Sequence, residues 1–268
     1  MNNLSGVAKR NQKRITAIYK AANHAITVEE AAAILKMSQK DVAKLMSRWV
    51  EQGWFSRIKR GLYVPTIKAN ENELPLNDPW IIATKIYGPC YIGALNAAEH
   101  WGLTNQKISR ISILTTRKPR NRNLVISSSA SILVRTIPQQ AMFGLESIVH
   151  DQTEVMISDP SRTIIDFMLD PELGGGIDNI FDVFNAYLKS EHRNVDLLFN
   201  YAKKMLNGAV LKRLGFLLER CQSGESNIIW FCRTLKTDGY IKLDPKKNAD
   251  KLITRWGLWI PDEWVNKV

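Results

Sequence analysis

The first fifty residues contain three segments with the apolar periodicity of amphipathic helices. Residues 9–23 combine that periodicity with a strongly basic start. Residues 26–38 place Glu30 three positions after Thr27, the capping-box spacing in which two side chains satisfy free amides of the first helical turn. In residues 39–53 the apolar positions fall at i, i+3, i+4, i+7 and i+8. The short turn between the last two segments predicts a helix-turn-helix.

A β-hairpin pattern replaces the helical one directly after these segments. WFSRIKRGLYVP contains two apolar runs separated by the basic turn Lys59-Arg60-Gly61 and ends at a proline, which predicts strand, turn and strand. Three helices followed by a hairpin with a basic tip make up a winged helix-turn-helix, which we assign to residues 1–70. The polar, proline-containing stretch that follows predicts a linker at residues 71–77.

The remaining residues, 78–268, predict a larger domain of mixed structure. Asp78 and Pro79 are placed as N-cap and first residue of a helix, whose apolar start is a candidate for contact with the N-terminal module, and YIGALNAAEHWGL predicts a second helix. From Lys107 to Asp159 the segments are rich in β-branched residues and predict a small sheet. Helical periodicity then returns, and YIKLDP with KLITRWGLWIP predicts a closing strand pair. The expected fold class is α+β, with a helical C-terminal half.

Positive charge is concentrated at the N-terminus. The chain carries a net charge of +11. Residues 1–70 hold 13 Lys and Arg against 4 Asp and Glu, a balance of +9, whereas residues 145–268 hold 16 against 18, a balance of −2. Such an asymmetry favours a dedicated nucleic-acid module followed by a domain with another task. Double-stranded DNA is therefore the expected partner.

The predicted third helix and hairpin carry the candidate DNA contacts. The polar residues left off the apolar stripe of the helix are suited to reading the major groove, although a solvated face is the alternative for this helix alone. The hairpin tip is placed to contact phosphate, which favours the DNA-binding interpretation. The candidate residues are Gln39, Lys40, Lys44, Ser47 and Arg48 on the helix and Arg57, Lys59 and Arg60 on the hairpin.

A second basic cluster lies in the loop RKPRNRN. It comprises Arg117, Lys118, Arg120 and Arg122. One interpretation is a solvated loop that keeps a sheet edge from pairing. The other is a second electrostatic contact, either to DNA beside the wing or to an acidic or nucleic-acid surface.

Patterns typical of enzymes are missing from the sequence. The triple glycine at 174–176 is not followed by Lys-Ser or Lys-Thr, so it predicts a turn and not a phosphate-binding loop. The four histidines are scattered and the three cysteines have no C-x-x-C spacing, so we expect no metal and no cofactor. Arg162 and Asp166, at i and i+4, predict an intrahelical ion pair. With no apolar stretch of membrane-spanning length and no signal sequence, the expectation is a cytoplasmic protein that is not an enzyme.

Four sequence segments, which occur in the order found in the family, resemble the AbiEi family of antitoxin-regulators. They are RGLYVP, YIGALNAAEHWGLTNQ, ISDPSRTIIDFMLDPELGGG and LKRLGFLLE, and they span about residues 25 to 260. The resemblance implies a toxin–antitoxin system of abortive infection, a phage defence. It implies an antitoxin that represses its own operon through the winged helix and counteracts a nucleotidyltransferase-like toxin through its C-terminal domain. Direct binding of the toxin is not implied.

Two alternatives to this interpretation stay open. The first is a plain transcription factor with a ligand-binding or protein-binding second domain. The second is an enzyme that processes nucleic acid.

Overall fold

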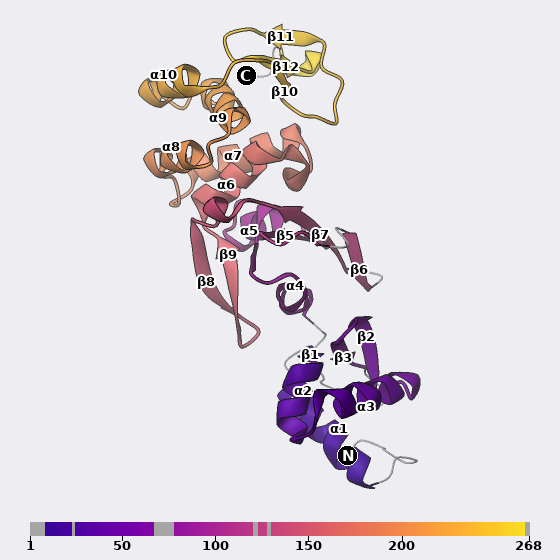
Figure 1. Cartoon of the computed structure of the whole chain (residues 1–268). Helices are drawn as coiled ribbons and strands as arrows, with labels where there is room; N and C mark the ends of the chain where they lie inside the picture. The colour runs from indigo at the N-terminus through magenta and orange to yellow at the C-terminus, as the bar shows by residue number, and fades with distance from the viewer. Residues whose placement is uncertain (1–8, 23–24, 67–77, 120–122, 128–129, 266–268) are drawn as a thin grey trace.

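A computed structural model of the chain describes residues 9–22, 25–66, 78–119, 123–127 and 130–265. The fold is mixed α+β, as the sequence predicted. Figure 1 shows an elongated molecule, with an N-terminal unit at one end, a sheet in the middle and a layer of helices at the other end. None of the described helices is long and apolar enough to cross a membrane.

The N-terminal unit consists of three helices and a three-stranded sheet of order β1-β3-β2. Its elements are α1 (Lys9–Ala21), β1 (Ile26–Thr27), α2 (Val28–Leu35), α3 (Gln39–Glu51), β2 (Phe55–Lys59) and β3 (Leu62–Pro65). The capping box of Thr27 and Glu30 is confirmed, because each residue's side chain accepts a hydrogen bond from the other's backbone amide. The turn between β2 and β3 needs Gly61, whose φ of +82° is strained for any residue with a side chain.

Aromatic side chains fix α3 in this unit. Trp49 is fully buried, and its ring stacks on that of Phe55 in β2 with centroids 5.9 Å apart. Tyr19 of α1 donates hydrogen bonds from its hydroxyl to the carbonyl oxygens of Trp54 and Thr66, at 2.5 and 2.9 Å. Both helices are therefore tied to the ends of the hairpin.

The middle of the molecule is a six-stranded mixed sheet of order β6-β7-β5-β4-β9-β8. The strands are β4 (Cys90–Ile92), β5 (Arg110–Thr115), β6 (Asn123–Ser127), β7 (Ala130–Thr136), β8 (Leu145–His150) and β9 (Thr153–Ser158), with helices α4 (Pro79–Tyr87) and α5 (Ala94–His100). Asp78 caps α4 by accepting from the amide of Trp80 at 2.8 Å, as predicted. The prediction of one continuous helix from residue 91 is wrong. Cys90, Tyr91 and Ile92 form a central strand, because all three are buried.

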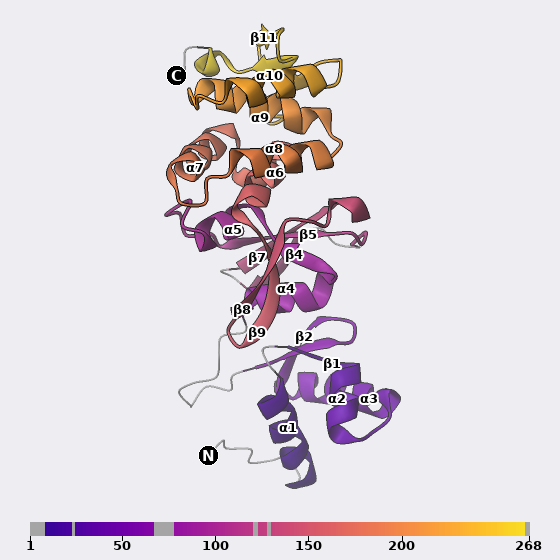
Figure 2. The same ribbon diagram turned by 90° about the vertical axis from the view of Figure 1, so that its left-hand side faces the viewer.

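Helices dominate the C-terminal half. They are α6 (Pro160–Leu169), α7 (Ile177–Lys189), α8 (Val195–Lys204), α9 (Gly208–Arg220) and α10 (Ser226–Leu235), with short 3-10 turns at Gln139–Ala141, Pro171–Gly174 and Asp262–Trp264. Figure 2 shows α6, α8, α9 and α10 in successive tiers beyond the sheet. The expected closing strand pair is instead a three-stranded sheet of β10 (Ile241–Lys242), β11 (Lys251–Ile253) and β12 (Leu258–Ile260), in which β10 runs parallel to β12.

The N-terminal unit packs directly on α4. Ile82 of α4 is fully buried in one cluster with Ala25, Leu62 and Val64 of the N-terminal unit, which agrees with the expected contact of this helix start. Lys85 adds a polar contact, because its Nζ donates to the carbonyl oxygen of Ala25 at 2.6 Å. The predicted linker, residues 71–77, lies outside the described residues, but the parts it joins share an apolar joint.

Candidate nucleic-acid interface

One face of α3 is fully presented to solvent. The five polar residues predicted for this face, Gln39, Lys40, Lys44, Ser47 and Arg48, are all exposed. The opposite side of the helix carries Val42, Met46 and Trp49, each fully buried. The orientation of α3 therefore follows from its apolar stripe, and the structure brings the predicted polar residues together on one surface.

Three cations run along that surface. Lys40, Lys44 and Arg48 follow one another at intervals of four residues, which places them on one side of the helix. Asp41 is the only carboxylate in the first turn, and it accepts a hydrogen bond from the Ser38 hydroxyl at 2.7 Å. That bond holds the carboxylate at the helix N-terminus, so the positive strip extends from Lys40 to Arg48 and ends at the exposed Glu51.

The hairpin cations divide into two kinds. Arg57, Lys59 and Arg60 are all exposed, and they differ in their contacts. Lys59 is turned toward α4, where its Nζ donates to the carbonyl oxygen of Ile86 at 2.9 Å. Burial lowers the pKa of Lys59, and the positive charge of Arg117 lowers it further. Lys59 therefore helps to hold the hairpin on α4, a role that the sequence did not suggest.

The second basic cluster starts beside the hairpin. Arg117 and Lys118 follow β5 and are exposed, and the charge of Arg117 acts on Lys59. Figure 1 shows β6 on the same side of the molecule as β2 and β3. The other two residues of the cluster, Arg120 and Arg122, lie outside the described residues. The described half of this loop thus extends the basic surface of the N-terminal unit onto the next domain.

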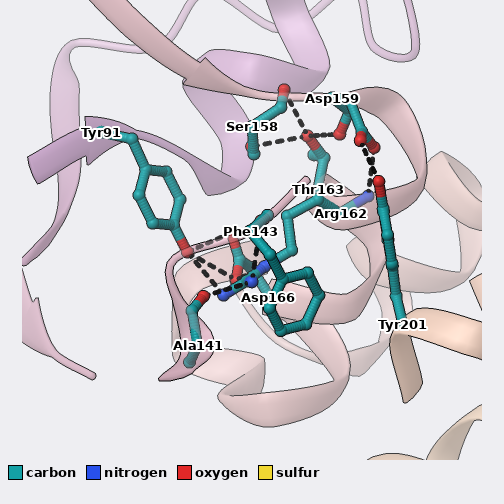
Figure 3. A network of polar contacts seen from close by, with 9 residues as sticks. All are labelled: Tyr91, Ala141, Phe143, Ser158, Asp159, Arg162, Thr163, Asp166 and Tyr201. Carbon is teal, nitrogen blue, oxygen red and sulfur yellow. Dashed lines mark hydrogen bonds and ion pairs between the residues drawn. The ribbon is translucent and has the colours of Figure 1, made fainter. Parts of the chain in front are cut away.

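A buried polar cluster lies far from this surface, where β4, α6 and α8 meet (Figure 3). The predicted ion pair is confirmed, since Arg162 Nε donates to Asp166 Oδ1 at 2.9 Å, but both side chains are fully buried. Three of the other four N–H donors of Arg162 are also used. They bind the carbonyl oxygens of Ala141 and Phe143, at 2.5 and 3.1 Å, and the hydroxyl of Tyr91, at 2.8 Å.

The partners of this cluster lie within the fold. Asp159 caps α6 by accepting from the Arg162 amide at 2.7 Å, and it also accepts from the Tyr201 hydroxyl of α8 at 2.8 Å. Burial raises the pKa of the Asp166 carboxyl, although the Arg162 guanidinium opposes the shift. Because these groups satisfy one another, the cluster fixes three elements together and offers no open site for a substrate. Within the described ranges, no three metal-binding side chains are grouped closely enough to hold an ion.

No model of a protein family matches the chain, and no curated protein matches it either. The candidate interface therefore depends on its own geometry: an exposed basic helix face, an exposed pair of hairpin arginines and an adjoining basic loop.

Proposed function

We propose that this protein is a DNA-binding transcriptional regulator whose N-terminal unit acts as a winged helix-turn-helix. The observation that carries the proposal is the exposed face of α3, on which every polar residue is exposed to solvent. The arginines of the β2–β3 hairpin are exposed as well. In this assignment α3 is the recognition helix in the major groove and the hairpin is the wing along the backbone.

The side-chain chemistry supports different roles for α3 and for the hairpin. Gln39 is suited to a bidentate contact with adenine, and Lys44 and Arg48 to the N7 and O6 acceptors of guanine. Arg57 and Arg60 are placed to contact phosphate, which sets position and carries no sequence information. Lys59 is assigned first to the joint with α4, because one of its N–H donors binds the Ile86 carbonyl.

The second domain extends the proposal in two ways. Arg117 and Lys118 supply a further phosphate contact beside the wing, supported by the action of Arg117 on Lys59. The resemblance to the AbiEi family supports an antitoxin that represses its own operon, with a nucleotidyltransferase-like toxin as its functional partner. On this proposal the domain protects without chemistry of its own, which fits the closed Arg162–Asp166 cluster.

Selection of duplexes from a random-sequence library by the full chain tests the DNA-binding proposal. We expect one enriched motif. Lys44→Ala should lower the preference for that motif over random DNA by about 1 to 3 kcal/mol, because it removes a base contact. Arg60→Ala should weaken both kinds of DNA alike, and Lys251→Ala, an exposed lysine of β11, should change neither. Failure to enrich any motif, or equal effects of all three variants, contradicts the proposal.

The antitoxin part is tested separately with the variant Lys44→Ala/Arg60→Ala. Coexpressed with the toxin encoded beside it, this variant should lose repression of a promoter reporter and still restore growth. Loss of both activities would mean that protection works only through repression of the toxin gene. Loss of neither would contradict the DNA-binding assignment itself.

A further inference from the structure

The last helix of the bundle, α10, leaves large apolar side chains uncovered. Trp230 is 52% exposed, Phe231 44% and Leu235 49%. Leu206, in the turn between α8 and α9, is 85% exposed. That turn lies beside the end of α10, because Gly208 approaches Thr237 so closely that an added Cβ would overlap it. We call these four residues the α10 face. Contiguous apolar surface of this kind marks an interaction site more often than scattered single residues do.

The α10 face is held rigidly. On its inner side α10 buries Ile228 and Cys232. On its flank the ring of Phe231 stacks on Phe199 of α8 with centroids 5.8 Å apart, and Trp230 packs edge-on against Phe231 at 5.0 Å. Figure 1 shows α8 and α10 together at the outer side of the helical layer. The exposed rings therefore belong to a preformed surface.

Helices α8 and α10 run in the same direction along this surface. Arg193 before α8 pairs with Glu225 before α10 at 2.8 Å, and Phe199 meets Phe231 in the middle of each helix. Lys203 lies one turn further on, with its Nζ 4.7 Å from the centroid of the Phe199 ring. The C-terminal ends of α8 and α10 thus lie at the same end of the face.

The charges around the face are mostly positive. Lys203 and Arg233 are exposed at or near its C-terminal end, whereas the Lys204 ammonium lies over the Phe143 ring, 4.3 Å from its centroid. The sequence of α10 contains no carboxylate, and Asp196, the only one in α8, lies in the first turn of that helix. Glu225 is paired with Arg193, and Asp238 acts on Lys212. An occupant of this face meets aromatic and aliphatic side chains bordered by cations.

We propose that the α10 face binds an amphipathic helix with an acidic polar side, supplied by a partner protein. Exposed tryptophan and phenylalanine on a rigid helix are typical anchors of such contacts, and the positive border selects a partner with carboxylates. Nucleic acid fits less well, because Leu206 and Leu235 offer bases no ring to stack on. A second copy of the chain on the same face would set like charges against each other. This inference does not depend on the DNA-binding role of the N-terminal unit.

A designed peptide tests the proposal on the full chain. The probe is a labelled helical peptide with leucines at positions i, i+3, i+4 and i+7 and glutamates elsewhere, and binding is followed by fluorescence anisotropy. We expect saturable binding that Trp230→Ala weakens by about tenfold or more, with Leu235→Ser as a second variant in the same direction. Val149→Ser, which removes an apolar side chain 76% exposed on the β8–β9 hairpin, should leave binding unchanged.

Controls separate this contact from other attractions. A peptide with lysine in place of glutamate and an acidic peptide with the leucines scrambled should each bind far more weakly. Binding that Lys44→Ala abolishes and Trp230→Ala does not would place the peptide on the basic face of α3 and overturn the proposal. No binding would overturn it too. So would preference for a single-stranded oligonucleotide, or dimerisation of the chain that Trp230→Ala abolishes.

Discussion

Replacing Arg162 by methionine should be among the most damaging single changes in the second domain. The guanidinium lies in a site with no solvent exposure and forms an ion pair with Asp166. Methionine keeps the volume of the aliphatic stem and removes all four hydrogen bonds. The Asp166 carboxylate then keeps only the hydrogen bond from the Tyr91 hydroxyl and has no counter-charge, in a medium that solvates it poorly. The carbonyl oxygens of Ala141 and Phe143 lose their bonds to the guanidinium as well.

The expected cost of Arg162→Met is about 3 to 5 kcal/mol, the range for breaking one side of a buried ion pair. Against a total stability of about 5 to 15 kcal/mol, this leaves a marginal domain. Burial already raises the pKa of Asp166, and loss of Arg162 removes the charge that opposes the shift. A carboxyl whose folded pKa is raised favours the folded state at low pH and loses that contribution as pH rises. The variant should therefore recover part of its stability at about pH 5.

Urea unfolding followed by circular dichroism measures the effect. The matched control is Arg255→Met, which removes an arginine 50% exposed whose guanidinium binds Glu219, and it should cost less than about 1 kcal/mol. The double variant Arg162→Met/Asp166→Leu should cost less than the sum of its single changes, because no charge is left without a partner. Equal losses for Arg162→Met and Arg255→Met would refute the argument that the pair is desolvated.

Two further predictions concern close packing and the joint between the domains. Gly215→Ala should destabilise the protein by about 1 to 3 kcal/mol in urea titrations, because the new Cβ would lie 2.1 Å from Trp256. Gly61→Ala has open space and should cost only backbone strain, about 1 kcal/mol, and equal losses would contradict this contrast. Burial opposes ionisation of Glu30, but hydrogen bonds and the Lys85 ammonium 3.4 Å away outweigh it and lower its pKa. Its stabilisation is thus present above about pH 4.5 and lost as pH falls through the lowered pKa. The protection factors for hydrogen exchange at the joint, corrected for the intrinsic rate at each pH, should therefore fall with acid in the wild type and not in Glu30→Gln.

Local capping signals predicted the starts of α2 and α4 correctly, whereas the short strands depended on distant partners. Thr27 and Asp78 cap helices through contacts within three residues, so the sequence alone contains the cause. The strand Cys90–Ile92 has only three residues and no alternation, since both its faces are covered. The pairing of β10 with β12 joins Ile241 to Leu258, a contact for which the intervening sequence gives no periodic sign.

The candidate interface could also be predicted where the cause is local, and not where it is a distant contact. The apolar stripe of α3 fixes which residues it exposes, so the polar face followed from spacing alone. The role of Lys59 did not, because its partner is a backbone carbonyl in α4 that no side-chain pattern reveals. Arg162 and Asp166 matched an ordinary surface pair in spacing, and only the packing of α6 against its neighbours shows that they are buried.

The salt dependence of DNA binding by the full chain tests the central claim most directly. Log affinity for a duplex should fall steeply and linearly with log salt concentration, because phosphate contacts release counterions. Arg60→Ala should reduce the slope by about 1, whereas Lys251→Ala, the control on β11, should leave it unchanged. An affinity that does not depend on salt, or a slope that Arg60→Ala leaves intact or that Lys251→Ala reduces equally, would contradict the account.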